Sequence, residues 1–245
     1  MEVIYIILLI SFLGPILGSL IGVMKRPSNL MMYNMLAFAA GVMLAISFLE
    51  LIPESINLSS IWLCCIGILF GALIMYVVDR IIPHIHPELV SQEQNCRLKR
   101  TALYLLIGIF LHNFPEGMAI AIGSVTSMKL SLVIAIAIAV HDIPEGICTS
   151  APYYYCTRKR LKSFLVSSAT AIPTVLGFFF AHFLYQNISL AAVGIIVGAT
   201  AGLMIYISGD ELIPTSCHKN LKHWSHSTIF SLIAGVVSVI LLGLL

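Results

Sequence analysis

The stretch HNFPEG at residues 112–117 recurs 29 residues later as HDIPEG at residues 141–146. Each copy lies inside a long apolar run, where an ionisable side chain is costly and usually functional. In a helix, the His and the Glu of each copy are four positions apart and share one face. The Pro between them removes a backbone donor and frees a carbonyl near these side chains. Two such helices facing each other predict a divalent-metal site in the middle of a membrane.

The side chains of the two copies suggest which ions the site would hold. Neutral imidazole combined with carboxylate suits Zn²⁺, Fe²⁺, Mn²⁺ and other first-row divalent ions better than Ca²⁺ or Mg²⁺. The residue after each His lies about 100° further round its helix, where it would serve a second, adjacent ion that the two glutamates bridge. In a plainer interpretation, the histidines are core residues whose hydrogen bonds are satisfied, and the prolines only kink their helices. Two copies of the motif, each at the centre of its span, favour the metal site instead. The candidate ligands are His112, Asn113, Glu116, His141, Asp142 and Glu145.

The composition excludes a soluble globular protein. Of the 245 residues, 59% are hydrophobic and only 10% are charged, and the mean hydropathy is +1.01. No long polar segment could form a separate soluble domain, so residues 1–245 are predicted to be a single transmembrane domain. The six cysteines are scattered without CxxC spacing, which indicates neither a disulfide framework nor a zinc finger. We expect the lipid bilayer and metal ions as partners, and no nucleic acid.

The apolar runs predict an all-α, polytopic membrane protein with eight transmembrane helices, each of about 20 residues. The expected spans are residues 3–24, 34–55, 60–82, 101–124, 129–151, 161–184, 190–213 and 227–245. The longest connection, residues 83–100, separates spans 3 and 4.

The basic residues predict the orientation. Twelve of the 13 Lys and Arg residues fall on the side of the membrane that holds the loops after spans 1, 3, 5 and 7, and Lys129 alone lies on the other side. Because cytoplasmic loops carry an excess of Lys and Arg, residues 83–100 are predicted to be cytoplasmic and both termini extracellular.

An internal repeat relates two spans. Residues 40–55 in span 2 align without gaps to residues 201–216 in span 7, with ten identities in sixteen positions that include Gly, Ser, Glu and Pro. Span 2 runs outward and span 7 inward, so the copies are predicted to be inverted. Spans 4 and 5, which carry the paired metal motifs, are antiparallel as well. Inverted repeats that meet at an ion site in mid-membrane are typical of secondary transporters.

Acidic and histidine residues mark a route on either side of the site. Glu50 and Glu54 near the outer end of span 2 would attract cations, and Asp210 and Glu211 near the inner end of span 7 would help to release them. The competing interpretation is that these are interfacial charges reaching into the headgroups. On the cytoplasmic side, histidines could hold metal as it leaves, or could simply be solvated loop residues. These histidines include His84, His86 and His218.

Two ladders of glycines spaced by four residues predict close helix packing rather than chemistry. They are Gly14, Gly18 and Gly22 in span 1, and Gly194, Gly198 and Gly202 in span 7.

The sequence as a whole resembles the ZIP (Zrt/Irt-like) divalent-metal transporters, especially the small bacterial zinc-uptake and GufA-like branch. The features that carry this resemblance are the paired HNxPEG and HDxPEG motifs, the ELIPES and DELIP span ends and the eight spans. The resemblance covers essentially the whole chain. It implies uptake of Zn²⁺, often with Fe²⁺, Mn²⁺, Co²⁺ or Cd²⁺, through a binuclear site, with an elevator-like motion and a homodimer. It assigns His112, Glu116, His141 and Glu145 to the first metal position. It assigns Asn113, Glu116, Asp142 and Glu145 to the second.

One position departs from the family pattern. Family members usually carry a Glu-Pro in span 6 whose Glu joins the second metal position, whereas this chain has Ile172 before Pro173. The substitution removes one negative charge and one oxygen ligand. The second metal position is therefore the weaker of the two, and occupancy by a single metal is the expectation.

The sequence thus predicts a plasma-membrane transporter that moves a divalent transition metal, most readily Zn²⁺, into the cytoplasm as its substrate, without a cofactor. The competing class is an intramembrane zinc-dependent hydrolase, in which bound Zn²⁺ activates water. That class is disfavoured because the chain has no HExxH motif, and an inverted repeat has no purpose in a one-sided enzyme. We therefore expect that the chain is not an enzyme.

Overall fold

The computed structural model of the chain describes residues 2–25, 27–81, 113–122, 125–216 and 226–244. Within these ranges every regular element is a helix and no strand occurs, which confirms the all-α prediction for the described part of the chain. In chain order the elements are α1 (Glu2–Met24), α2 (Asn29–Ala45), η1 (Ile46–Leu51), α3 (Ile52–Leu58), α4 (Ile61–Ile81), a helical stretch at residues 113–121, α7 (Met128–Thr157), α8 (Arg160–Ser168), α9 (Ala171–Tyr185), α10 (Leu190–Ile207), η3 (Ser208–Leu212), α11 (Ile213–Ser216) and α12 (His226–Leu242).

Six helical stretches among the described residues are long and apolar enough to cross a membrane. They are Tyr5–Met24, Leu30–Leu58, Ile61–Arg80, Met128–Ala151, Arg160–Tyr185 and Leu190–Ser216. Each overlaps one of the eight predicted spans. The predicted eighth span coincides with α12, a shorter apolar helix, and most of the predicted fourth span, together with the connection at 83–100, lies outside the described residues.

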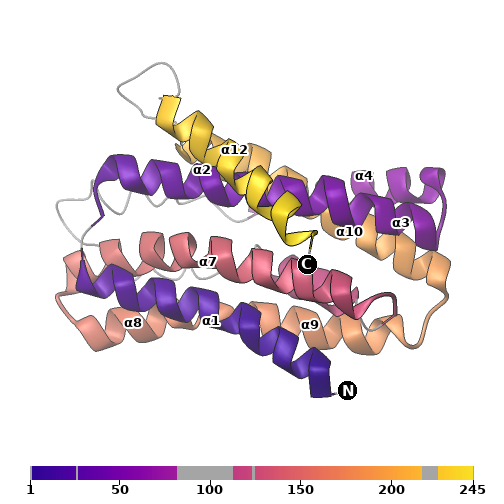
Figure 1. Cartoon of the computed structure of the whole chain (residues 1–245), viewed down its shortest axis with the longest axis horizontal. Helices are drawn as coiled ribbons and strands as arrows, with labels where there is room; N and C mark the ends of the chain where they lie inside the picture. The colour runs from indigo at the N-terminus through magenta and orange to yellow at the C-terminus, as the bar shows by residue number, and fades with distance from the viewer. Residues whose placement is uncertain (1, 26, 82–112, 123–124, 217–225, 245) are drawn as a thin grey trace.

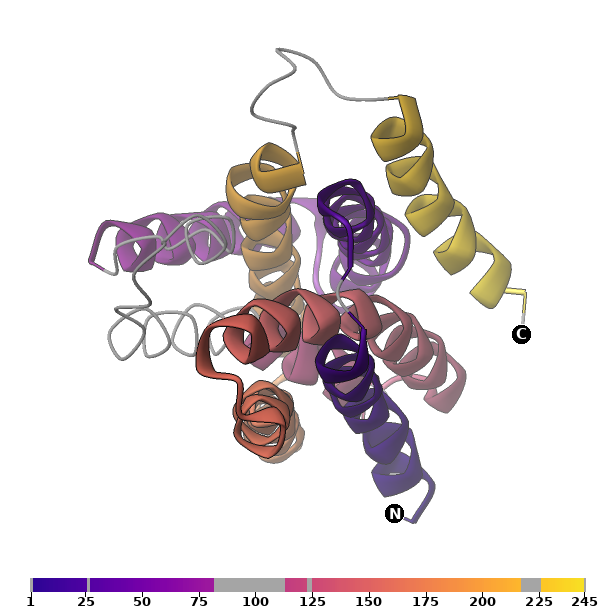
Figure 2. The same ribbon diagram turned by 90° about the vertical axis from the view of Figure 1, so that its left-hand side faces the viewer.

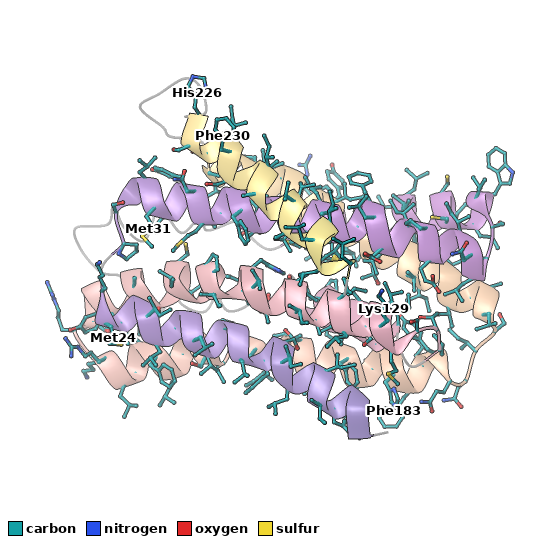
Figure 3. The ribbon with its side chains drawn as sticks, in the orientation of Figure 1. Met24, Met31, Lys129, Phe183, His226 and Phe230 are labelled. Carbon is teal, nitrogen blue, oxygen red and sulfur yellow. The ribbon has the colours of Figure 1, made fainter. Side chains whose placement is uncertain are left out.

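The outer surface of the helix bundle carries large apolar side chains. Phe183 on α9 is 63% exposed and Phe230 on α12 is 69% exposed, and Figure 3 shows both side chains extending away from the bundle. Trp62 at the start of α4 is 80% exposed. An exterior of this kind is stable against hydrocarbon and costly in water.

The helices form two layers (Figure 1). One layer holds α1, α7, α8 and α9, and the other holds α2, α3, α4, α10 and α12. Within the layers, α1 packs along α7, α4 along α10 and α2 along α12. Figure 2 shows the same bundle from its end, with α7 on the side of its layer that faces α2. The layers meet where α2 contacts α7.

Glycines allow the helices of a layer to approach each other closely. A Cβ added to Gly18 on α1 would overlap the carbonyl oxygen of Ile143 on α7, and a Cβ on Gly202 in α10 would overlap the carbonyl oxygen of Ile68 on α4. Small residues let helix backbones come together in a membrane, where apolar surfaces gain nothing by hiding from lipid. The prediction that both glycine ladders serve packing is confirmed.

The two matched stretches of the sequence carry the same helical irregularity. η1 and η3 are π-helical segments at corresponding places, each just before a proline. The backbone N–H of Ile52 donates to the Ser47 carbonyl, and that of Ile213 donates to the Ser208 carbonyl, so each bond spans five residues. Because Pro53 and Pro214 have no N–H, the regular four-residue ladder is interrupted beside them.

The serines of these segments also correspond. Ser47 Oγ donates to the Met43 carbonyl at 2.8 Å, and Ser208 Oγ donates to the Met204 carbonyl at 2.8 Å. Back-bonding of this type competes with the helix ladder and bends helices. The two stretches therefore share the same local interruption of the helix ladder.

We expect the Gly18→Ala variant to destabilise the protein by about 1–3 kcal/mol, because the added Cβ overpacks the contact between α1 and α7. Thermal unfolding in detergent, followed by size-exclusion fluorescence, measures the change. Gly209→Ala is the matched control, since a Cβ there meets no atom within 4 Å. Equal melting temperatures for the two variants would contradict the packing role of Gly18.

Candidate metal site

The site forms where the helical stretch 113–121 faces the middle of α7. Glu116 projects from the first of these helices, and His141 and Asp142 project from the second. All three side chains are fully buried. One ligand atom from each lies within 4.8 Å of the others, which makes them a compact group able to hold a metal ion.

His141 connects the two helices. Its Nε2 lies 2.9 Å from Glu116 Oε1 and 3.3 Å from Asp142 Oδ1. Its Nδ1 lies 3.1 Å from the Ala137 carbonyl oxygen, which can only accept, so Nδ1 carries a proton and donates. That bond fixes the ring and directs Nε2 to the carboxylates, as an outer partner does for a metal-binding histidine.

Several oxygen atoms of the site find no hydrogen-bond donor in the described part of the chain. These buried oxygens are Asn113 Oδ1, Glu116 Oε2 and both carboxylate oxygens of Asp142. Buried carboxylates are costly unless they are paired or coordinate a metal. Imidazole nitrogen with several oxygens is a donor set for Zn²⁺ and other first-row divalent ions.

Not every predicted ligand falls within this compact group. His112 lies outside the described residues. Glu145 is one turn further along α7 and outside the compact group, yet close enough to Glu116 and His141 for their charges to interact. Asp142, expected to serve an adjacent ion, has an oxygen directly beside His141 Nε2.

Asn113 is held by a residue that the sequence did not single out. Its Nδ2 donates to the Thr170 carbonyl oxygen at 2.8 Å. Thr170 lies in the short break between α8 and α9, and only the Pro173 that follows hints at that break in the sequence. The break therefore supplies a carbonyl at the depth of the site.

Ile172, which stands where the family pattern has a carboxylate, does not join the buried group. Its side chain is 53% exposed, whereas Thr170 and Thr174 beside it are buried. On this side of the site the described residues offer hydroxyl and carbonyl oxygens and no carboxylate.

The four acidic residues predicted for the route differ in their surroundings. Glu50 and Glu54 are half-buried, Glu211 is half-buried and Asp210 is exposed. Glu211 is close enough to Glu145 for their charges to interact. The histidines predicted to hold departing metal, His84, His86 and His218, lie outside the described residues.

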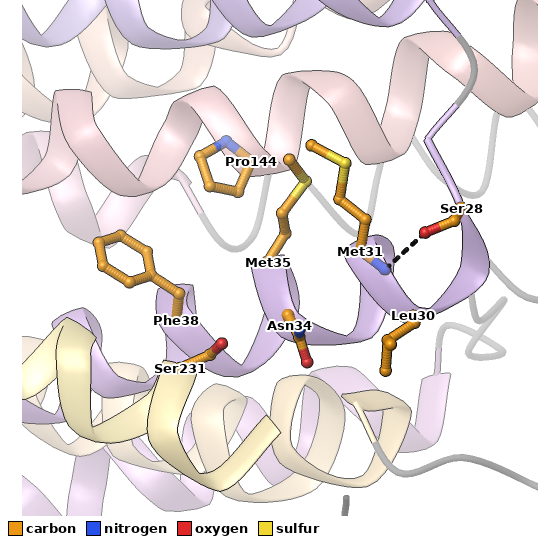
Figure 4. Close-up of a pocket in the computed structure, with 8 residues that line it drawn as sticks. All are labelled: Ser28, Leu30, Met31, Asn34, Met35, Phe38, Pro144 and Ser231. Carbon is orange, nitrogen blue, oxygen red and sulfur yellow. Dashed lines mark hydrogen bonds between the residues drawn. The ribbon is translucent and has the colours of Figure 1, made fainter. Parts of the chain in front are cut away.

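A pocket of about 390 Å³ opens between α2, α7 and α12. Figure 4 shows Met31 and Met35 extending from α2 toward Pro144 of the second motif. The pocket reaches from the start of α2, where Ser28 caps the helix by accepting from Met31 N–H, to the residue before Glu145. It is lined by Ser28, Leu30, Met31, Asn34, Met35, Phe38, Pro144 and Ser231.

Comparison with known proteins agrees with this arrangement. The family model described as "ZIP Zinc transporter" matches residues 1–97 and 87–243. The zinc transporter ZupT of Escherichia coli O127:H6 is 34% identical over 222 residues, which cover 87% of this chain and 86% of that protein. The ZupT of Escherichia coli K12 matches with the same identity and coverage.

These matches extend over nearly the whole chain and agree with a bundle of apolar helices around a buried His, Glu and Asp. They give no support to a hydrolase. The chain therefore belongs to the ZIP zinc transporter family, as an integral membrane protein that transports zinc or a similar divalent metal and is not an enzyme.

Proposed function

We propose that the chain moves Zn²⁺ from outside the cell into the cytoplasm through the group formed by Glu116, His141 and Asp142. The single observation that carries this proposal is the burial of these side chains while three of their carboxylate oxygens, Glu116 Oε2 and both oxygens of Asp142, have no hydrogen-bond partner among the described residues. A cation passing through would supply the missing charge and contacts. The substrate ion is also matched by the chemistry of the donors, imidazole nitrogen and carboxylate oxygen.

The ligands divide into two neighbouring positions in this proposal. His112, Glu116, His141 and Glu145 form the first, and Asn113 and Asp142 join the two glutamates in the second. The 3.3 Å between Asp142 Oδ1 and His141 Nε2 supports positions that adjoin. Because Ile172 adds no charge and is half exposed, we propose that one ion at a time is sufficient for transport. Fe²⁺, Mn²⁺, Co²⁺ and Cd²⁺ are candidate competitors.

The route to and from the site follows acidic groups. Glu50 and Glu54 attract the ion from outside, and Glu211 and Asp210 help it to leave. The interaction between Glu211 and Glu145 supports a transfer from the site to η3. The pocket that reaches Pro144 from the start of α2 supports an aqueous exit on the side that holds Lys25. His84, His86 and His218 could then receive the metal.

The proposed topology has eight spans, with both termini outside a plasma membrane and an inverted repeat that relates spans 2 and 7. The hydrogen bond from Ser55 Oγ to the Gly194 carbonyl oxygen, 2.7 Å long, supports the inversion. It joins the end of one matched span to the beginning of the other, as antiparallel copies require. The resemblance to the family adds a homodimer and an elevator-like motion to this proposal.

We expect Glu116→Gln and His141→Ala each to reduce Zn²⁺ uptake by more than the roughly 10- to 100-fold that loss of an outer-shell partner costs a metal site. Zinc-65 uptake into proteoliposomes, with the reconstituted protein quantified, measures this effect. His226→Ala is the control, because His226 is exposed at the start of α12 (Figure 3). Parental uptake by a double variant of His112→Ala and Glu116→Ala would refute the site.

We also expect uptake to fall as the external pH drops below about 6.5, because protons compete with the metal for imidazole and carboxylate. Initial rates at saturating and at limiting Zn²⁺ separate this competition from a loss of protein. The expected pattern is a rise in KM with little change in the maximal rate. Uptake that is absent for Zn²⁺, Fe²⁺, Mn²⁺, Co²⁺ and Cd²⁺ at every pH would refute the proposed transport.

A further inference from the structure

The two metal motifs differ at one position, where the first has Asn113 and the second has Asp142. We infer that the Thr170 carbonyl is a positioning group that holds the Asn113 amide so that its oxygen serves the metal. The inference rests on the proposed function and explains why this position carries an amide rather than a carboxylate.

The contact that carries the inference is buried and directional. Asn113 Nδ2 donates to the Thr170 carbonyl oxygen at 2.8 Å, and both residues are buried. An asparagine side chain offers two donors on nitrogen and an acceptor oxygen, so the bond to a carbonyl decides which end of the amide faces which neighbour. The nitrogen end faces Thr170.

The oxygen end is therefore left for another partner. Asn113 Oδ1 is buried and has no hydrogen-bond partner among the residues that the structure describes. Glu116 lies three residues further on, which places it on the same helix face as Asn113. Glu116 Oε2 is likewise buried without a partner. The fixed amide thus contributes a neutral oxygen next to a carboxylate oxygen, where a cation gains from both.

The partner carbonyl lies at an interruption of span 6. α8 ends at Ser168 and α9 begins at Ala171. The Thr170 N–H and hydroxyl both turn back to the Ser167 carbonyl, at 3.1 Å and 2.7 Å. These bonds hold the turn, and the Thr170 carbonyl faces the helix that bears Asn113. A broken helix in a membrane is tolerated where its backbone groups find partners or line a site.

A simple count of charges predicts that an aspartate at position 113 would improve the site, which is the opposite of what the inference predicts. Since Ile172 supplies no carboxylate, an aspartate at position 113 would restore a negative charge and should bind Zn²⁺ more tightly. In the arrangement inferred here, that aspartate cannot donate to the Thr170 carbonyl. Its oxygen would instead meet another oxygen at hydrogen-bond distance, and the side chain would turn away.

The test compares Asn113→Asp with Asn187→Asp in the full-length protein, using Zn²⁺ uptake into proteoliposomes. We expect KM for Zn²⁺ to rise about tenfold in Asn113→Asp, the effect of one buried hydrogen bond on binding. Asn187→Asp is the matched control, because Asn187 Nδ2 also donates to a backbone carbonyl, that of Phe183 at 2.6 Å, but at an exposed position away from the site. Its KM should stay within about twofold of the parent value.

The outcomes separate the inference from its alternatives. An unchanged or lower KM in Asn113→Asp would overturn the inference in favour of charge counting. Less folded protein with an unchanged KM would also overturn it, because that result indicates a purely structural bond. If the parent itself moves no metal, the proposed function fails, and the inference is then decided by a measurement that needs no transport.

That measurement is hydrogen exchange of side-chain amides in protein labelled with ¹⁵N at asparagine. The parent should show a slowly exchanging amide, with or without Zn²⁺, that is missing from Asn113→Ala. Protection without metal is expected because the partner is a backbone carbonyl and not the ion. An Asn113 amide that exchanges as fast as an exposed one would refute the inference whether or not transport is observed.

Discussion

The burial of His141 against Glu116 is the constraint on which the rest of the structure depends. The two side chains meet at 2.9 Å inside an apolar bundle, where leaving either group uncompensated would cost several kcal/mol. Only a partner from another helix, a proton or a metal ion can meet that cost. The fold must therefore bring the polar groups of different helices together in the interior of the bundle. The surrounding apolar residues exclude water that would compete for these groups.

Close packing between backbones makes this convergence possible. Gly18 brings α1 against Ile143 of the second motif, and Gly117 of the first motif lies against the Thr174 carbonyl of α9. In both cases a glycine next to a metal-motif residue lets a neighbouring helix approach. The glycine that ends each PEG motif thus belongs to the packing, whereas the His and Glu belong to the chemistry. The motif combines both requirements in six residues.

The irregular helices have a common cause. The π-helical segments before Pro53 and Pro214 and the break before Pro173 all occur where a proline withholds an N–H. Within a membrane the freed carbonyls must find other donors. Polar side chains bond to backbone carbonyls at these places: the hydroxyls of Ser47 and Ser208 donate to the Met43 and Met204 carbonyls, and the Asn113 amide donates to the Thr170 carbonyl. Irregular backbone therefore occurs next to polar side chains that can donate to it.

The sequence by itself determined the helical class, the apolar spans and the chemistry of the site, because hydropathy and the His and Glu spacing act locally along a helix. It also indicated the matched stretches, since identical Ser and Pro residues produce the same π-helical irregularity. Only the tertiary structure decided that Asp142 sits beside His141 Nε2 and that Glu211 comes within electrostatic range of Glu145. Only the fold, likewise, turned Ile172 outward and brought the Thr170 carbonyl to Asn113. The pairs Glu211 with Glu145 and Thr170 with Asn113 are far apart in the chain, and helix rotation and breaks, which no local spacing encodes, bring them together.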